Sequence, residues 1–162
     1  MTFPPRWPSL WVALGLSYGV AALGGALTDI GPWYLALKQP DWKPPDLWFG
    51  PIWTTLFTLG AISGWLAWHG ARWPHARRRV AWLFGMNALL NVAWSALFFA
   101  LKRPDWAMYE WGLLWASVAA LPLGLWRISR PAALLNLPYL AWVSVAGALN
   151  WQNIVLNGPF GS

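Results

Sequence analysis

The sequence predicts an all-α integral membrane protein, a bundle of five transmembrane helices, on three observations. Of its 162 residues, 58% are hydrophobic and only 10% are charged, whereas a soluble domain carries about 25% charged residues. The apolar residues form five stretches, each long enough for the roughly 20 residues that a membrane-spanning helix needs. The seventeen Trp suit membrane interfaces and aromatic pockets better than a soluble core, where each indole N–H needs a partner.

The first two spans enclose the longest connection in the chain. The first span is expected over residues 8–27, and we expect it to be retained, because the short segment before it lacks the charged region and cleavage site of a signal peptide. Residues 28–45 form a connection rich in Pro and Trp. The second span is expected over residues 46–68, because Asp46 directly after two prolines is typical of a helix start.

The last three spans are separated by short basic segments. Residues 69–79 are expected to form a basic loop, followed by spans over 80–101, 105–126 and 131–156. Pro131 can occupy the first turn of the fifth span. A proline bend is expected within each of the last two spans, at Pro122 and Pro138.

The basic residues indicate an orientation. Five spans place the two termini on opposite sides, which sorts the basic residues into two sets. One set is Arg6, Arg72, Arg77, Arg78, Arg79, Arg127 and Arg130; the other is Lys38, Lys43, Lys102 and Arg103. The excess of the first set favours a cytoplasmic N-terminus if the protein lies in an inner membrane. Orientation and anionic headgroups therefore explain the net charge of +6, and no nucleic-acid partner is expected.

Small residues one turn apart occur at Gly15-xxx-Gly19 and Gly60-xxx-Gly64. Such pairs let helices approach closely in lipid, and we expect them to pack helices within the chain. The alternative is a homodimer seam on one of these pairs or on the ridge of Ala96 and Ala100.

Several chemistries are excluded or disfavoured. The chain has no Cys, which removes thiol chemistry and thiolate metal sites. Glu110 and Asp46 are expected at headgroup level, so no proton relay is predicted within the bundle. His69 and His75 lie in the basic segment, too close to the interface to be paired haem ligands. We therefore assign no catalytic residue, no metal ligand and no obligatory cofactor.

Aromatic and amide side chains are the remaining functional candidates. Spacings of three and four residues place an indole and its neighbours on one face of each of three helices. The sets are Trp53 with Phe57, then Asn87, Asn91, Trp94 and Phe98, and then Trp142, Ala146 and Asn150. Such faces suit a pocket for a planar apolar ligand with a few hydrogen-bonding groups, such as a tetrapyrrole, a sterol or a heteroaromatic drug. The alternative is that Trp fills gaps and Asn links helices.

Three motifs resemble those of the TspO/MBR family, which contains translocator proteins and tryptophan-rich sensory proteins. They are WYLALKQPDWKPP at 33–45 followed by WTTLF at 53–57, LNVAWSALFF at 90–99, and PYLAW at 138–142 with Leu149 and Asn150. The resemblance implies one five-helix domain over residues 1–162, a homodimer, and a cavity that opens toward the first connection and takes porphyrins and benzodiazepine-type drugs. By motif, its lining would be Tyr34, Trp53, Asn87, Asn91, Trp94, Trp142 and Ala146.

The sequence also departs from the family pattern. Gln39, Leu47, Phe57 and Asn87 stand where the family usually has Lys, Trp, Tyr and Gln, and these changes could alter ligand preference. The sterol motif of animal members needs a basic residue late in the fifth helix, and none follows Arg130. Specific cholesterol binding through that motif is therefore not expected.

Three functions are consistent with these residues. The first is a receptor or sensor that binds porphyrin-like tetrapyrroles between the helices and could transport them. The second is light- and oxygen-dependent degradation of the bound porphyrin, with the indoles as reaction partners. The third is a regulatory helical module that acts through a partner protein.

Overall fold

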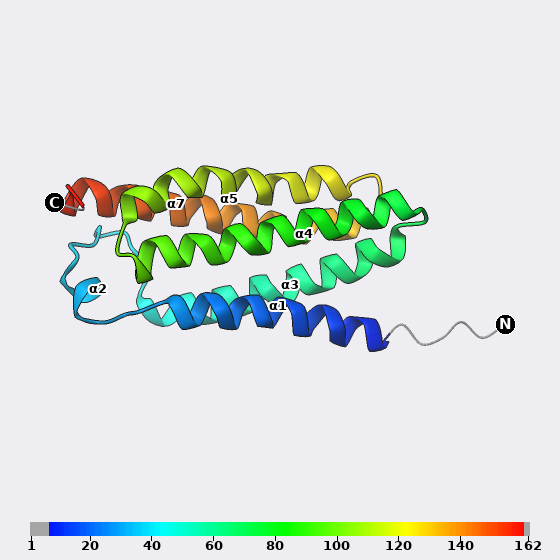
Figure 1. The fold of residues 1–162 in the computed structure, drawn as a ribbon, viewed down its shortest axis with the longest axis horizontal. Coiled ribbons are helices and arrows are strands. Elements are labelled where there is room, and N and C mark those ends of the chain that lie inside the picture. Colours follow the sequence, from blue (N-terminus) through cyan, green and yellow to red (C-terminus); the bar gives the residue numbers. More distant parts are fainter. Residues whose placement is uncertain (1–6, 161–162) are drawn as a thin grey trace.

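The computed structural model describes residues 7–160, and these residues form helices and no β-strand. Five helices have 21 or 22 residues and run along the long axis of the molecule (Figure 1). They are α1 (Trp7–Leu27), α3 (Phe49–Gly70), α4 (Pro74–Ser95), α5 (Pro104–Leu125) and α7 (Leu137–Asn157). Shorter pieces are α2 (Pro32–Ala36), the 3₁₀ turn η1 (Asp46–Trp48), the π-helical turn η2 (Ala96–Ala100) and α6 (Arg130–Leu134). Arg6 lies outside the described residues.

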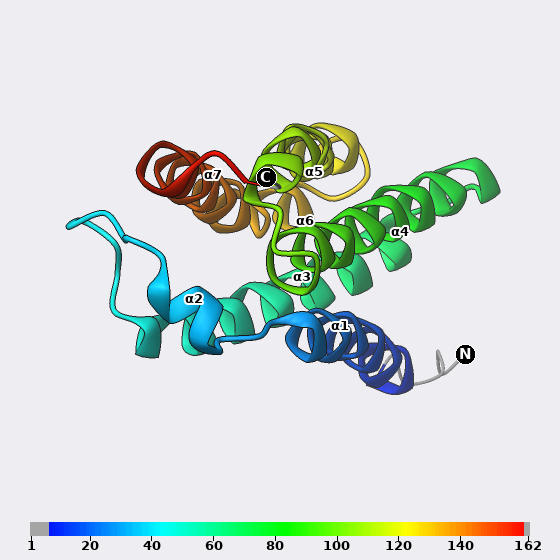
Figure 2. The same ribbon diagram turned by 60° about the vertical axis from the view of Figure 1, so that its left-hand side comes forward.

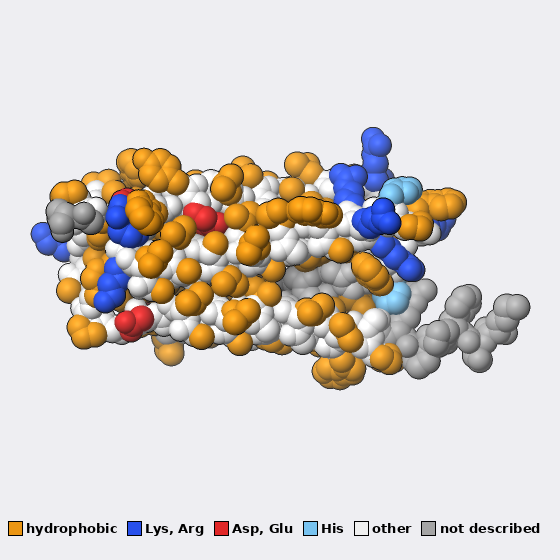
Figure 3. Space-filling model, viewed as in Figure 1, with side chains coloured by type: hydrophobic (Ala, Val, Ile, Leu, Met, Phe, Trp, Pro, Cys, Tyr) orange, Lys and Arg blue, Asp and Glu red, His pale blue; other side chains and the backbone are white. Residues whose placement is uncertain are grey.

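Within residues 7–160, three helical segments are long and apolar enough to cross a membrane: Trp7–Leu27, Pro74–Ala100 and Arg130–Asn157. Hydrophobic side chains cover much of the face in Figure 3, whereas Lys and Arg gather toward the two ends of the bundle. Large apolar side chains such as Trp11, Trp82 and Leu123 are more than two-thirds exposed. An exterior of this kind fits lipid as the surrounding solvent.

The basic loop predicted between the second and third spans is too long. The helix expected from residue 80 begins at Pro74, so Arg77, Arg78 and Arg79 are helical and only Ala71–Trp73 connect α3 to α4. The reason is that proline suits the first turn of a helix, where its missing N–H has no helical acceptor to lose. The second span begins with η1 at Asp46, as expected, and becomes α-helical at Phe49.

The predicted fifth helix is interrupted before its proline. Pro131 occupies the first turn of α6, as expected, but α6 ends at Leu134 and α7 begins at Leu137. Pro138 lies in the first turn of α7 and does not bend it from within. At the interruption, the buried amide nitrogen of Asn136 donates to Ala132 O at 2.8 Å and to Ser63 Oγ at 2.7 Å. The bond to Ser63 ties the break in the fifth span to α3, and the bond to Ala132 connects it to α6. Helix α5, by contrast, runs through Pro122 without ending.

The helices pack unevenly. Helix α5 packs against α4 and α7, and α1 packs against α3 and α4; in Figure 2 α1 and α3 lie on the opposite side of the bundle from α5 and α7. A Cβ atom at Gly147 on α7 would lie 2.1 Å from the Trp111 ring of α5. A Cβ atom at Gly60 on α3 or Gly85 on α4 would meet nothing within 4 Å. The α5–α7 contact is therefore close at Gly147. Helices α1 and α3 also pack against each other, and the open space at Gly60 and Gly85 lies between this pair and α4.

The glycine pairs do not pack helices together as predicted. A Cβ atom at Gly15, Gly19 or Gly60 would meet nothing within 4 Å, and at Gly64 it would make only ordinary contact with Phe84, at 3.7 Å. Gly15 and Gly19 lie on the exposed side of α1, and Gly60 and Gly64 line a cavity. The glycines of α3 therefore make room, and the close approach occurs at Gly147, which the sequence pattern did not single out.

Candidate ligand-binding site

A cavity of about 630 Å³ lies between α1, α3 and α4, with contributions from α5 and α7. Its size falls within the range of small-molecule sites, which is about 300–1,000 Å³. Apolar and small side chains line most of it, including Leu16 on α1, Gly60 on α3 and Phe84 on α4. The cavity follows from the helix faces: spacings of three and four residues on α3 and α4 bring small and aromatic residues to one side.

Aromatic rings form one half of the cavity wall. The Trp53 ring lies 5.7 Å from Phe57 and 6.2 Å from Tyr139, centroid to centroid, with the Tyr139 ring nearly edge-on. These residues come from α3 and α7, and all three line the cavity. Such tilted and edge-on arrangements are the favoured geometries of aromatic pairs. The wall therefore offers flat apolar faces held by neighbouring rings.

Two amides on α4 add polarity to this half. Asn87 and Asn91 are one turn apart, both buried, and both line the cavity. The Asn91 amide nitrogen donates to the Tyr139 hydroxyl at 2.9 Å, and that of Asn87 donates to Ser117 Oγ at 3.0 Å. Each amide thus links α4 to another helix, as buried polar groups require.

The residues predicted to form one site lie in different places in the structure. Trp53, Phe57, Asn87 and Asn91 line the main cavity. Trp142 lies in a second, shallower pocket between α3 and α7, where its ring packs against Phe49 at 5.5 Å. The remaining predicted residues, Tyr34, Trp94, Phe98 and Ala146, line neither pocket.

Trp94 packs against the hydrophobic core of the bundle. Its ring stacks on Phe98 at 5.1 Å and packs against the core cluster that contains Leu56 and Tyr139. The indole N–H groups of Trp94 and Trp142 are both buried and have no hydrogen-bond partner among the described residues. Because buried donors generally have an acceptor, these two N–H groups could donate to a bound ligand.

Sequence reasoning missed several cavity residues. Phe84 lies three residues before Asn87 and seven before Asn91, so the helical spacing already placed it on the same face. Tyr139 lies in the PYLAW motif and lines the cavity, but it is not among the residues predicted to do so. The face of α1 that contributes Val12, Leu16 and Ser17 had no such signal, because α1 is apolar around its whole circumference.

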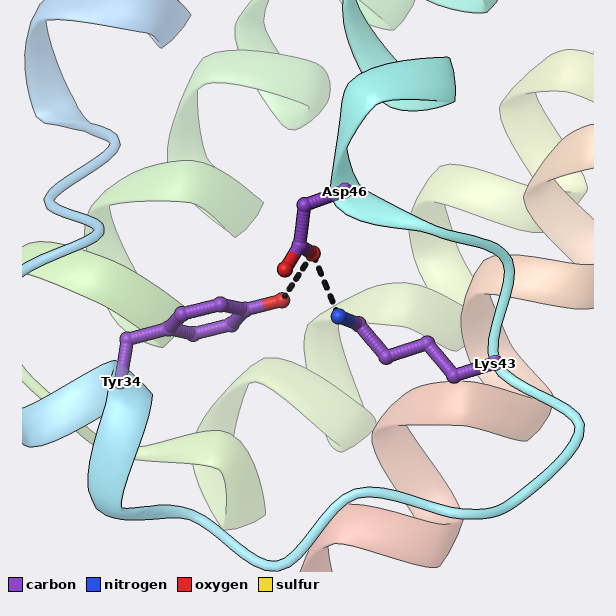
Figure 4. Close-up of polar contacts among 3 residues, drawn as sticks. All are labelled: Tyr34, Lys43 and Asp46. Carbon is purple, nitrogen blue, oxygen red and sulfur yellow. Dashed lines mark hydrogen bonds and ion pairs between the residues drawn. The ribbon is translucent and has the colours of Figure 1, made fainter.

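The long first connection closes over one end of the bundle, and its polar groups meet at Asp46 (Figure 4). The Tyr34 hydroxyl donates to Asp46 Oδ1 at 3.3 Å, and the Lys43 ammonium pairs with the same oxygen. The ammonium also lies 5.6 Å from the Tyr34 ring and 5.8 Å from the Phe49 ring. Burial raises the pKa of Tyr34. Burial lowers the pKa of Lys43, but the bond to Asp46 and the nearby Tyr34 outweigh it, so the net shift of that pKa is upward.

A second contact ties this connection to the end of α7. The Lys38 backbone N–H donates to Asn157 Oδ1 at 2.7 Å, and the Asn157 amide nitrogen donates back to Lys38 O at 2.9 Å. The Asn157 side chain therefore pairs with both backbone polar groups of Lys38, as a residue of a neighbouring strand would. The connection that leaves α1 is thereby held to the opposite side of the bundle.

These features define a helical membrane protein that encloses a cavity suited to a largely apolar ligand. No group of three or more potential metal ligands occurs among residues 7–160. The chain belongs to the TspO/MBR family, whose sequence pattern matches residues 9–156.

Curated relatives support this assignment across nearly the whole chain. The chain is 36% identical to the tryptophan-rich protein TspO of Chlorobaculum tepidum, covering 92% of this chain and 96% of the relative. It is 33% identical to the protein CrtK of Rhodobacter capsulatus, with 92% and 93% covered. It is 34% identical to the translocator protein of Bos taurus, with 92% and 89% covered. Membership in a family of membrane sensor and translocator proteins confirms the predicted resemblance.

Proposed function

We propose that this protein crosses the membrane five times and acts as a receptor or sensor that binds a porphyrin-like tetrapyrrole in the cavity between α1, α3 and α4. The observation that carries the proposal is the aromatic half of that cavity, where Trp53, Phe57 and Tyr139 present flat faces beside two amides. A tetrapyrrole is planar and mostly apolar, and it carries a few polar substituents. Stacking on aromatic rings with a few placed hydrogen bonds is how such ligands are generally held.

The proposed placement in the membrane uses all five long helices. Their lengths of 21 and 22 residues correspond to about 30 Å, the thickness of the hydrocarbon core. The end that carries most of the arginines would face the cytoplasm, together with the start of α1. A homodimer, which the family resemblance implies, stays a prediction.

The test is a titration with protoporphyrin IX in the dark, followed by quenching of Trp fluorescence in detergent. Wild type should show saturable binding. Trp53→Ala should weaken it roughly tenfold, which corresponds to about 1.4 kcal/mol. Trp82→Ala is the matched control, because Trp82 lies on α4 but is 68% exposed and lines neither pocket. Linear quenching, or equal binding by both variants, would contradict the proposed site.

Trp142→Ala distinguishes the two pockets. If the ligand occupies the main cavity, Trp142→Ala should bind nearly as well as wild type, because Trp142 contributes only to the shallower pocket. A larger loss with Trp142→Ala than with Trp53→Ala would move the ligand to the pocket between α3 and α7. That pocket then offers the unused Trp142 N–H as a donor.

Degradation of the bound porphyrin is the second candidate, because three indoles, Trp53, Trp65 and Trp68, line the cavity. Illumination of the complex in the presence of oxygen should then bleach the porphyrin band faster than in the Trp53→Ala complex at equal occupancy. Equal bleaching rates would leave binding as the function.

A further inference from the structure

The two ends of the bundle carry different charge. One end, here called the arginine end, carries Arg72, Arg77, Arg78, Arg79, Arg127 and Arg130 in the connections and first turns between α3 and α4 and between α5 and α6. Of the five acidic residues in the sequence, Asp29, Asp41, Asp46 and Asp105 lie at the opposite end, and Glu110 lies on the second turn of α5. Among the described residues, no carboxylate therefore neutralises the arginine end, where basic side chains gather in Figure 3.

The main cavity extends to the arginine end. Beyond its aromatic half it continues along Ala13 and Leu16 of α1, Gly64 of α3, and Ala81 and Gly85 of α4. These side chains are small or aliphatic, and Phe84, Trp65 and Trp68 add aromatic rings to the same half, so its lining is largely apolar. Figure 3 shows the surface recessed between α1 and α4 in this region.

Polar groups mark where this half of the cavity ends. The Trp65 indole N–H donates to Ser9 Oγ at 3.1 Å, and Ser9 Oγ lies 2.8 Å from His69 Nε2. Ser9 and Trp65 both line the cavity. An apolar groove that ends in hydrogen-bonding groups has the polarity pattern of an amphiphile.

Arg77 connects the groove to the basic surface. Its guanidinium lies 5.6 Å from the Trp68 ring, and Trp68 lines the cavity. Arg77 also precedes Ala81 by four residues and Phe84 by seven, so it extends the cavity-lining face of α4 by one turn. The order along the groove is therefore an apolar channel, then an indole, then an exposed cation.

We propose that the half of the cavity toward the arginine end holds one acyl chain of an anionic phospholipid from the surrounding membrane, with the lipid phosphate against Arg77. The largely apolar lining suits a hydrocarbon chain. A guanidinium pairs with a phosphate through two parallel hydrogen bonds. The absence of carboxylates at this end, among residues 7–160, leaves the arginines available to an anion. This inference does not depend on tetrapyrrole binding, which the proposal above places in the aromatic half.

The test is native mass spectrometry of the full-length protein without porphyrin. The protein is released from detergent that contains equal amounts of phosphatidylglycerol and phosphatidylcholine with identical acyl chains. Wild type should retain one phosphatidylglycerol molecule in preference to phosphatidylcholine. Gly60→Leu with Gly85→Leu should reduce retained lipid at least tenfold, because the new side chains fill the channel. Both positions have open space for a Cβ atom, so this variant should fold.

Two matched variants make the result specific. Gly15→Leu with Gly19→Leu makes the same change on the exposed side of α1, where a Cβ atom also meets nothing, and should retain lipid as wild type does. Arg77→Gln should remove the preference for phosphatidylglycerol while the acyl chain still binds. Arg130→Gln should keep that preference, because Arg130 lies over Trp126, which does not line the cavity.

Equal retention of the two lipids by wild type would overturn the proposal. So would undiminished phosphatidylglycerol binding in the Gly60→Leu, Gly85→Leu variant, provided that its helical circular dichroism and thermal transition match wild type. If that variant fails to fold, Arg77→Gln decides alone: an unchanged lipid preference in this exposed substitution rules out the proposed phosphate contact.

Discussion

The α5–α7 side of the bundle and the α1–α3–α4 side use the same residue types for opposite purposes. On the first side, Gly147 lets the Trp111 ring approach the α7 backbone so closely that a Cβ atom would lie 2.1 Å from it. On the second, Gly60 and Gly85 face open space within a cavity. Glycine therefore allows a close approach of α7 to the Trp111 ring on one side and leaves space for a cavity between helices on the other.

Tryptophan shows the same division. On the packed side, the Trp111 indole donates to Val143 O at 2.8 Å and the Trp115 indole donates to Ser144 Oγ at 2.8 Å, so both join α5 to α7. On the hollow side, Trp53, Trp65 and Trp68 line the cavity. The indoles of Trp111 and Trp115 thus join two helices, and the rings of Trp53 and Trp68 border a cavity. Trp65 does both, because its N–H donates to Ser9 of α1.

The largest effect that this comparison predicts is at Gly147. Gly147→Ala should force the Trp111 ring away from α7 and break its bond to Val143 O, which should destabilise the protein by about 3 kcal/mol. Gly60→Ala is the control, and it should leave stability unchanged or slightly higher, since alanine favours helix and its methyl group meets no atom. Unfolding in detergent micelles measures both. Equal stability of the two variants would show that the two sides do not differ in packing.

The next effect concerns the link between the sides at Asn136. Asn136→Ala removes two buried hydrogen bonds, one to Ser63 of α3 and one to Ala132 O of α6, and we expect a loss of about 2 kcal/mol in unfolding free energy. The loss in a Ser63→Ala background should be smaller, because Ser63 is one of the two acceptors. Additive effects in this double-mutant cycle would mean that the two side chains do not act together.

A smaller effect is expected at Tyr139, which lies where the packed core meets the cavity. Tyr139→Phe removes the acceptor of the Asn91 amide and should cost about 1 kcal/mol, because the buried amide loses its partner. Tyr109→Phe is the control, since Tyr109 is 84% exposed and should not change stability. A Tyr139→Phe variant as stable as this control would indicate that another group satisfies Asn91.

The smallest effect on stability is expected at Asn157, whose side chain holds the first connection to the packed side. Asn157→Ala should change the unfolding free energy by less than about 0.5 kcal/mol, because the bonds are exposed. It should nevertheless speed hydrogen exchange of the Lys38 amide, which loses its acceptor. The Leu37 amide, which donates to Tyr34 O, is the internal reference. Unchanged exchange at Lys38 would mean that the connection is held elsewhere.

The sequence predicted the features that depend on residues close together along the chain. The long helices lie near the expected positions, and Asn87 and Asn91 share a cavity-lining face as their spacing required. The errors in the positions of helix starts and bends concern prolines: Pro74 starts a helix inside the expected basic loop, and Pro138 follows a break and does not bend a helix. Proline is compatible with a helix start and with a bend, and the choice depends on neighbouring partners such as Ser63 and Asn136.

The sequence by itself determined the all-helical character and the preference for a membrane. In lipid, each helix must satisfy its backbone hydrogen bonds within its own segment, so composition and length suffice. Only the tertiary structure decided which faces enclose space. Helix α1 is apolar on every side, and Gly60 and Gly147 are chemically identical. Whether a glycine contacts a ring or borders a cavity depends on side chains from other helices. Their packing cannot be predicted from the residues next to that glycine in the sequence.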